Sequence, residues 1–348
     1  MAGAAQPGAP GAPDAPGSDA VLVLRALGLG DLLTAVPALR ALRRAHPERP
    51  LVLAAPARLA EAAAATGAVD RLLPAEGPGR AVPGRLEWAG PPPAVAVDLH
   101  GNGEASHRLL RALRPVRLLA FADPAVPDAP GPEWREDEHE RRRWCRLLEA
   151  YGVPADPEDL HIPVPGRPSP APGATVLHPG ADAAARCWPP ERFAAVAAGL
   201  RRAGHRVVLT AGAGEAELAH GIARRAGLPP TAVHGGGADV PFAELTALVA
   251  GARAVVSGDT GLAHLASALA APSVVLFGPV SPVLWGPPDH PRHRVLWRPD
   301  PDAPGAVRPG DAHGTRTDPR LLRITADEVL DAVARLPRPA RAAAAPLP

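Results

Sequence analysis

The sequence contains no lysine, only two cysteines and no excess of either charge. Cys145 and Cys187 cannot form a disulfide framework, and neither lies in a Cys-x-x-Cys motif or a zinc-type cluster. All 37 basic residues are arginine, and 36 acidic residues balance them. This balance argues against a protein that binds nucleic acid through a large basic surface. We therefore expect a reduced, cytoplasmic protein with no nucleic-acid partner.

Long apolar runs are also missing, so the sequence predicts no transmembrane segment. The longest candidate, residues 265–280, contains Pro272 and Gly278 and is better explained by a helix followed by a buried strand. Residues 1–19 lack the basic region of a secretory signal, and their composition predicts a disordered arm. Residues 337–348 are rich in alanine and proline and are predicted to be a flexible tail.

Short apolar runs alternate with helical patterns along most of the chain, which is typical of parallel βαβ units. The predicted strands are residues 21–25, 51–54, 94–98, 116–121, 174–178, 206–210, 253–257 and 273–277. The predicted helices are residues 32–42, 104–113, 137–151, 190–203, 215–226, 241–251, 262–270 and 325–336. Pro37 should bend the first of these helices, and Thr325 and Glu328 have the spacing of a capping box.

A proline-rich stretch without periodicity, residues 154–173, is predicted to link two domains. The expected domains are residues 20–153 and 174–336. Each follows the pattern of a Rossmann-like, doubly wound α/β domain. Such a pair would bind its ligand in the cleft, at the carboxyl ends of both sets of strands.

The first βα turn offers a carboxylate beside two glycines. Gly28 and Gly30 match the start of a dinucleotide fingerprint, but Leu33 occupies the third glycine position and the acidic residue after the second strand is missing. A hydride-transfer domain is therefore disfavoured. Glycines allow another molecule to approach the backbone closely, and Asp31 is a candidate catalytic base at the mouth of a helix. Asp31 can equally be a helix N-cap.

The segment Ser257–Ala266 has the pattern of an anion site. A strand ends, Asp259, Thr260 and Gly261 turn the chain, and a helix begins with its free N–H groups facing the cleft. His264 lies one helical turn after Thr260, so both can face one ligand. The alternative is that Asp259 or Thr260 caps the helix and that His264 is a buried core histidine.

Two further residues are candidates for a nucleotide ligand. Arg186 lies in a loop between a strand and a helix, where a guanidinium can hold a diphosphate through two N–H groups. Glu215 begins a helix and can accept hydrogen bonds from a ribose or a base. The alternatives are a solvated loop arginine and an acid that stabilises a first helical turn.

Five segments, in this order, resemble glycosyltransferase family 9, the ADP-heptose:lipopolysaccharide heptosyltransferase type. They are LGLGDLLTAVPALRAL, VDLHGNGEASHRLL, HPGADAAARCWP, LTAGAGEAELA and SGDTGLAHLASALAAPSVVLFGPVSP, and the last is the most diagnostic. The resemblance covers about residues 20–290. It implies a GT-B architecture, in which the first domain binds an acceptor and the second binds a nucleotide sugar.

The resemblance also implies an inverting sugar transfer with no metal or other cofactor. Asp31 matches the family's general base, Arg186 its phosphate-binding lysine and Glu215 its nucleoside-binding acid. Asp259, Thr260, Gly261 and His264 match its donor-binding Asp-Thr-Gly-x-x-His motif. The implied partners are a nucleotide-sugar donor, with ADP-heptose first, and a glycan or glycolipid acceptor of the cell envelope.

The chain departs from the family pattern after residue 178, where hydroxyl residues are common but Ala181 and Asp182 stand here. An acid would repel a diphosphate, so we expect Asp182 to point away from it or to face a different sugar. Asp300-Pro301-Asp302 has the form of a metal-binding Asp-x-Asp, but it lies in a proline-rich loop. We interpret it as no metal site.

Two other functions remain as alternatives. One is a sugar-nucleotide epimerase with the same two domains, and the other is a nucleotide-sugar-binding protein without activity. An arginine face formed by Arg40, Arg43 and Arg44 could contact anionic lipid, which would give a peripheral contact with the inner membrane face. A solvated helix face is the favoured interpretation.

Overall fold

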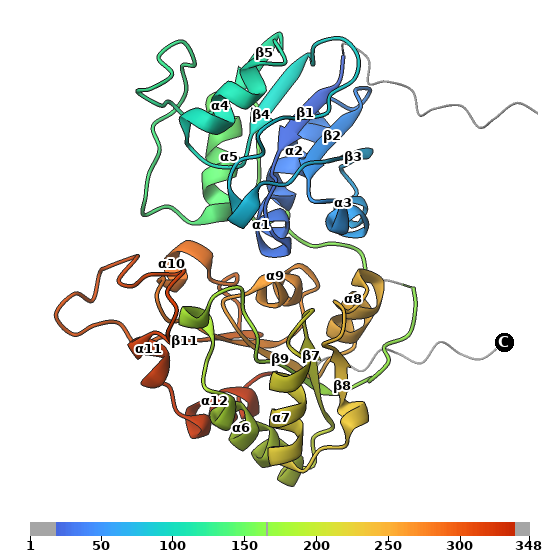
Figure 1. The fold of residues 1–348 in the computed structure, drawn as a ribbon, viewed down its shortest axis with the longest axis vertical. Helices are drawn as coiled ribbons and strands as arrows, with labels where there is room; N and C mark the ends of the chain where they lie inside the picture. Colours follow the sequence, from blue (N-terminus) through green and yellow to red (C-terminus); the bar gives the residue numbers. More distant parts are fainter. Residues whose placement is uncertain (1–18, 165, 338–348) are drawn as a thin grey trace, which may run out of the picture.

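The chain forms two parallel β-sheets, each with helices on both faces (Figure 1). A computed structural model describes residues 19–164 and 166–337. The predicted α/β architecture of two doubly wound halves is confirmed. Most of the predicted amino-terminal arm and carboxy-terminal tail lies outside the described residues.

The first sheet has the strand order β3-β2-β1-β4-β5, so β1 lies at its centre. Its strands are β1 (Val21–Leu24), β2 (Leu51–Ala55), β3 (Arg71–Pro74), β4 (Val95–Asp98) and β5 (Arg117–Leu119). Successive residues of β1 pack on opposite faces: Val21 and Val23 on one, Leu22 and Leu24 on the other. Burial on both faces explains why this strand is a continuous apolar run.

Five helices flank this sheet: α1 (Leu29–Thr34), α2 (Val36–Ala45), α3 (Ala60–Ala65), α4 (Glu104–Arg111) and α5 (Glu140–Ala150). The prediction of one bent helix over residues 32–42 was wrong, because the chain breaks at Ala35 into α1 and α2. Pro37 occupies the first turn of α2, where a missing N–H costs nothing. The proline therefore starts a second helix instead of bending the first.

The second sheet has the strand order β11-β10-β9-β6-β7-β8. Its strands are β6 (Thr175–His178), β7 (Val207–Ala211), β8 (Val233–Gly235), β9 (Ala254–Gly258), β10 (Ser273–Leu276) and β11 (His293–Leu296). Its helices are α6 (Pro190–Arg202), α7 (Ala216–Ala226), α8 (Phe242–Ala250), α9 (Gly261–Ala268), α10 (Pro282–Trp285), α11 (Pro319–Leu322) and α12 (Ala326–Ala334). The capping box predicted at Thr325 and Glu328 is confirmed at the start of α12.

The three strands that the sequence analysis missed are β3, β8 and β11. All three lie at sheet edges and contain polar or half-exposed residues, as in the His293–Leu296 segment of β11. An edge strand has one neighbour and one less buried face, so its sequence lacks a strong apolar signal. Within residues 19–164 and 166–337, no helix has the length and apolar character needed to cross a bilayer.

Residues 154–173 connect the two sheets and contain no helix or strand among those described. They nevertheless pack on both halves. The Ile162 N–H donates to the carbonyl of Ala268 in the second half. Asp159 forms ion pairs with Arg40, at 2.8 Å, and with Arg44 of α2 in the first half.

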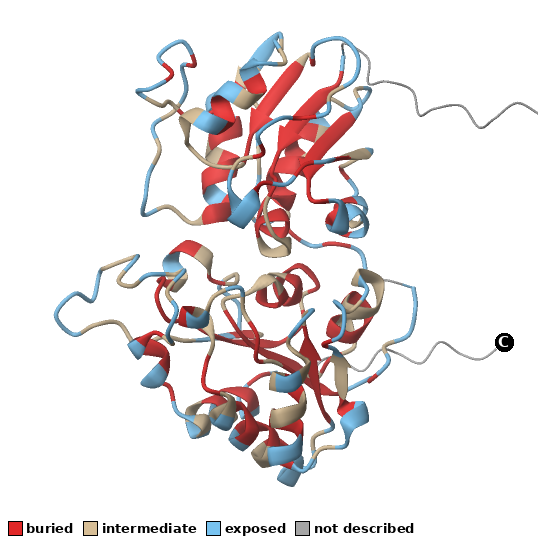
Figure 2. Cartoon of the chain, viewed as in Figure 1, coloured by how far each residue is buried: buried red, intermediate tan, exposed pale blue. Residues whose placement is uncertain are grey.

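A shared apolar cluster joins the two halves. Leu33 and Val36, from α1 and α2, pack in one cluster with Leu262 and Leu265 of α9 and with Ile162 of the connecting segment. Figure 2 shows buried and half-buried residues in α1 and α9 where these helices face each other. This seam fixes how the carboxyl ends of the two sheets meet, and the candidate site residues lie there.

Candidate active site

The first turns of α1 and α9 lie against each other across the seam (Figure 1). A Cβ added to Gly30 would lie 2.8 Å from Cδ2 of His264 and 3.4 Å from Cα of Gly261. A Cβ added to Gly261 would lie 3.3 Å from the backbone nitrogen of Gly30. The absence of side chains at both glycines therefore allows the helices to approach closely. The structure thus brings together two motifs that are 230 residues apart in the sequence.

Asp31 lies in the first turn of α1 and is 6% exposed. Its Oδ2 accepts hydrogen bonds from the Gly28 N–H, at 3.0 Å, and from Nη2 of Arg80, at 2.6 Å. Its Oδ1 lies 3.8 Å from Nη2 of Arg25. The N-cap residue is Gly28, so the N-cap interpretation of Asp31 is wrong, although its carboxylate does support the helix start. The described residues give Oδ1 no hydrogen-bond donor.

Two arginines that shape this site had no assigned role in the sequence analysis. Arg25, at the end of β1, donates to the Asp31 carbonyl at 2.9 Å and to Glu140 of α5 at 2.9 Å. It is 1% exposed and holds the turn between β1 and α1 in place. Arg80 follows β3 in a loop without apolar periodicity, so no pattern in the sequence could point to it.

The turn between β9 and α9 presents hydroxyl and amide groups to the seam. Thr260 is the N-cap residue of α9, but its side chain makes no capping hydrogen bond. Its Oγ1 and the Oγ of Ser257 are buried without a hydrogen-bond partner among the described residues. Buried polar groups without partners carry a cost, which a ligand bound at this turn would remove. The capping interpretation therefore fails for Thr260.

Asp259 and His264 flank this turn, with Oδ1 and Nε2 3.8 Å apart. Burial raises the pKa of Asp259 to about 6, against the attraction of the Arg186 guanidinium, which lowers it. Burial also lowers the pKa of His264 to about 4. His264 is therefore neutral at pH 7, and its ring packs edge-on against Trp285 with the centroids 5.8 Å apart. A carboxyl group with a strongly shifted pKa at a helix N-terminus is typical of a functional site.

Arg186 reaches the same turn from the loop after β6. Its Nη1 donates to the Asp259 carbonyl at 3.3 Å, and its Nη2 lies 3.6 Å from Oδ2 of Asp182. Its Nε is buried without a partner among the described residues, so this is not a fully solvated loop arginine. Whether Asp182 points away from a bound diphosphate or faces a different sugar stays a prediction, but its carboxylate does not point away from this arginine. Asp182 instead pairs with Arg186 and, at 3.0 Å, with Arg80.

Glu215 lies immediately before α7, at the carboxyl end of β7. Its Oε2 accepts a hydrogen bond from the Gly212 N–H at 2.7 Å. A Cβ on Gly180 would overlap this carboxylate, so the loops after β6 and β7 touch here. The side chain therefore supports the turn before α7; the predicted role of an acid within the first helical turn is wrong, because Glu215 is the N-cap residue and makes no capping hydrogen bond. Glu215 follows β7 and Arg186 follows β6, and these strands are neighbours in the second sheet, so both residues lie beyond its carboxyl edge.

A family model described as glycosyltransferase family 9 (heptosyltransferase) matches residues 134–309, just over half of the chain. The chain belongs to glycosyltransferase family 9. Lipopolysaccharide heptosyltransferase 3 of Escherichia coli is 35% identical over 114 residues, which are 32% of this chain and 33% of that protein. Lipopolysaccharide heptosyltransferase 1 of Pseudomonas aeruginosa is 36% identical over 141 residues, 39% of this chain and 35% of that one. The matched segment thus spans about a third of these curated relatives.

Solved structures share the fold over nearly the whole length. The ADP-heptose lps heptosyltransferase II of E. coli has a TM-score of 0.68 at 20% identity, and the match covers 90% of this chain and 97% of that one. The family 9 glycosyl transferase of Veillonella parvula has a TM-score of 0.69 at 18% identity, covering 91% and 96%. At these identities the likeness establishes the GT-B fold alone.

This family 9 chain offers no obvious metal site in its described parts. No group of three or more His, Cys, Asp or Glu residues is arranged to hold an ion within residues 19–164 and 166–337. In the Asp300-Pro301-Asp302 segment, Asp300 is engaged by Arg320 and, at 3.1 Å, by Arg323. A carboxylate held by two guanidinium groups is a poor ligand for a cation. The related TibC of enterotoxigenic E. coli is described as iron-containing.

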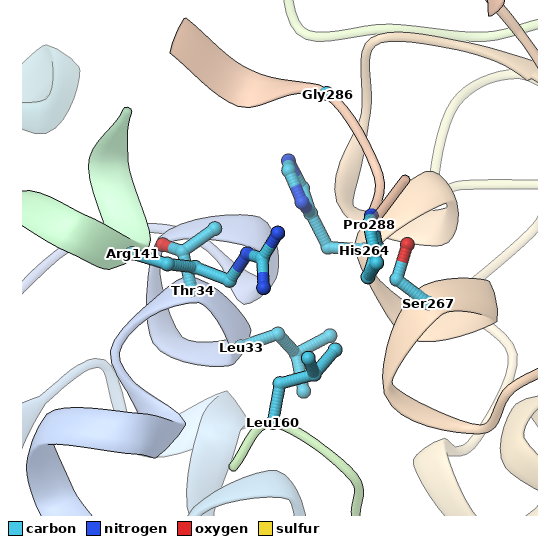
Figure 3. Close-up of a pocket in the computed structure, with 8 residues that line it drawn as sticks. All are labelled: Leu33, Thr34, Arg141, Leu160, His264, Ser267, Gly286 and Pro288. Carbon is cyan, nitrogen blue, oxygen red and sulfur yellow. The ribbon is translucent and has the colours of Figure 1, made fainter. Parts of the chain in front are cut away.

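Two cavities of this glycosyltransferase-family chain bear on ligand binding, and only the smaller is lined by a candidate site residue, His264. Figure 3 shows the smaller, where His264 and Ser267 of α9 face Leu33, Thr34 and Arg141 of the first half. Its volume is about 10 Å³, the space of one water molecule, so the halves are closely packed here. The larger, about 510 Å³, is lined by Asn102 and by residues of the 122–134 loop. That volume is in the range of small-molecule sites.

Proposed function

We propose that this protein is an inverting, metal-independent glycosyltransferase that moves a sugar from a nucleoside diphosphate to a glycan or glycolipid of the cell envelope. ADP-heptose is the donor that its family and its relatives best support. One observation carries the proposal. A buried carboxylate, Asp31, and a phosphate-binding turn at Asp259–His264 come from opposite halves and meet at one seam.

The second half, residues 174–336, supplies the groups that would hold the donor. The first N–H groups of α9 and the hydroxyl of Thr260, which has no partner among the described residues, belong to the turn that the guanidinium of Arg186 contacts. Amides at a helix N-terminus and an arginine fork both favour a phosphate. They would also stabilise the charge that develops on the departing diphosphate, so the reaction has no need of a metal ion. Glu215, at the next strand end, is placed for a ribose or base.

The first half, residues 20–153, supplies the base and the acceptor site in this proposal. Oδ2 of Asp31 is occupied by the Gly28 N–H and by Arg80, which leaves Oδ1 to accept the proton of the acceptor hydroxyl. The hydroxyl oxygen attacks the anomeric carbon from the face opposite the diphosphate, so the configuration inverts. Base catalysis of this kind contributes about 10²–10⁴-fold to the rate. The 510 Å³ cavity at Asn102 is the candidate acceptor site.

The proposal places the enzyme in the cytoplasm, with at most a peripheral contact with a membrane. The arginine face of α2 gives little support to a lipid contact. Arg40 and Arg44 pair with Asp159, and Arg43 pairs with Asp70. These two acids offset two of the three positive charges that anionic lipid would need.

The test follows the release of nucleoside diphosphate from ADP-heptose and other nucleotide sugars, with and without candidate acceptors. Asp31→Asn should lower turnover by at least about 10²-fold without weakening donor binding, because asparagine can accept the same hydrogen bonds but cannot take a proton. Asp302→Asn, an exposed carboxylate outside the seam, is the matched control and should retain full activity.

Three outcomes would contradict the proposal. Equal turnover of Asp31→Asn would remove Asp31 from the mechanism. Isomerisation of the sugar without an acceptor would indicate the epimerase alternative. Tight donor binding without any release, across a panel of acceptors, would indicate a binding protein.

A further inference from the structure

Arg80 is one of three described residues other than glycine with a positive φ, together with Arg114 and Ala270. It ends the turn Pro78–Arg80, in which Gly79 has a φ of 57° and Arg80 a φ of +69°. Positive φ is uncommon for a residue with a side chain and costs free energy. Such strain persists where surrounding contacts determine the conformation, and it is often found at functional sites. The contacts of the Arg80 side chain are therefore informative.

The guanidinium of Arg80 connects the two halves of the protein. Nη2 donates to Oδ2 of Asp31 in the first half at 2.6 Å. Nη1 donates to Oδ2 of Asp182 in the second half at 3.0 Å. Arg80 thus joins the candidate base to the loop that carries the candidate phosphate-binding arginine.

Asp182 completes a chain of alternating charges. Its Oδ2 lies 3.0 Å from Arg80 and 3.6 Å from Nη2 of Arg186, so one carboxylate oxygen sits between two guanidinium groups from opposite halves. A phosphate oxygen prefers the same environment, because arginine forks match carboxylate and phosphate alike. The Asp182 side chain is 69% exposed, and exposed ion pairs are weak. A more highly charged anion can therefore displace it.

We propose that Asp182 is a built-in counter-anion that occupies Arg80 and Arg186 until the donor's diphosphate replaces it, and that Arg80 is then a second phosphate-binding residue. This inference rests on the proposed function and adds a donor contact from the first half. Because Arg80 also binds Asp31, the position of the base depends on whether the donor is bound. Asp182 weakens donor binding and speeds the departure of the diphosphate product.

The test is calorimetric binding of ADP to the whole protein at low salt. Asp182→Asn should bind ADP about 3- to 10-fold more tightly, the effect of removing one unit charge near the ligand in a largely solvated site. Arg80→Gln should bind ADP about 3- to 10-fold more weakly. Both effects should shrink at 0.5 M salt, because exposed charges are screened. Melting curves establish that each variant is folded.

Matched controls carry the same charge changes elsewhere. Glu87→Gln and Arg58→Gln remove an exposed acid and an exposed base of the first half, which pair with Arg85 and Glu76. Both should leave ADP affinity unchanged. Unchanged affinity in folded Asp182→Asn or Arg80→Gln, or an equal shift in the controls, overturns the inference.

Arg186→Ala separates this inference from the proposed function. If Arg186→Ala weakens ADP binding but Arg80→Gln and Asp182→Asn leave ADP affinity unchanged, the donor site stands and the counter-anion is refuted. If the wild type binds neither ADP nor UDP, GDP or CDP, both proposals fail. The charge argument does not depend on the nucleobase. Whichever nucleoside diphosphate binds must therefore give the same order of affinities among the variants.

Discussion

Replacing Gly30 by alanine tests whether the close contact between α1 and α9 matters for activity. The new methyl group would lie 2.8 Å from Cδ2 of His264, while ordinary contact begins at 3.4 Å, so one group must move by about 0.6 Å. The His264 ring cannot retreat freely, because Trp285 packs against it. Overpacking of this kind costs about 1–3 kcal/mol. Alanine also gains about 1 kcal/mol over glycine inside a helix, so the net loss of stability should be about 0–2 kcal/mol.

Activity should fall further than stability. A displacement approaching 1 Å between the Asp31 carboxylate and the donor turn can lower the rate by about 10²-fold. The measurements are turnover, as release of nucleoside diphosphate, and the free energy of unfolding in urea. Gly221→Ala is the matched control, since Gly221 lies in α7 and its nearest neighbour is 4.0 Å from the added Cβ. This control should gain about 1 kcal/mol and keep full activity. A Gly30→Ala protein as stable and as active as Gly221→Ala would refute the close-contact reasoning.

Two further predictions concern the turn at α9. Thr260→Val should weaken ADP binding by about 3- to 10-fold without loss of stability, because the Thr260 hydroxyl is buried with no partner among the described residues. Unchanged ADP affinity would contradict a role of this hydroxyl in donor binding. Burial places the pKa of Asp259 at about 6 against 3.8 for an ordinary aspartate, so the folded state binds its proton more tightly than the unfolded state does. Ionising Asp259 therefore costs stability as the pH rises from about 4 to about 6, and folded Asp259→Asn avoids this cost. The free energy of unfolding of Asp259→Asn, relative to that of the wild type, should rise by about 2 kcal/mol over that pH interval and then level off. If urea unfolding gives the same difference in free energy between the two proteins at pH 4.5 and at pH 7, the prediction is refuted.

The order of the central strands and main helices could be predicted because their residues are buried on two faces or on one stripe. Val21–Leu24 is a continuous apolar run, Ala254–Gly258 begins with one, and a helical pattern follows each. Of the edge strands, β5 was predicted, but β3, β8 and β11 were not, because segments such as Arg71–Pro74 and Val233–Gly235 expose polar groups and resemble loops. The break at Ala35 was missed because one apolar stripe runs through both α1 and α2.

The candidate site residues likewise fall into those that could be predicted from the sequence and those that could not. Asp31, Asp259, Thr260 and His264 could be found from the sequence, since each lies in a strand–turn–helix segment whose geometry is local. Arg80 could not, because it lies in an irregular loop and acts only through contacts with Asp31 and Asp182. Asp182 was noticed as a departure from the family, but its two arginine partners were not predicted. The chain alone contains no information on the arginine that faces it from 102 residues away.

The sequence by itself determined the two α/β halves, the family and the turns that end β1 and β9, because these depend on local periodicity and on glycine, proline and capping residues at fixed spacing. The tertiary structure decided which of those turns face each other and which charges meet between them. The approach of Gly30 to His264 and the bridge from Asp31 through Arg80 to Asp182 depend on the packing of α1 against α9. Such contacts arise when two separately folded sheets share one apolar seam, and no local pattern specifies them.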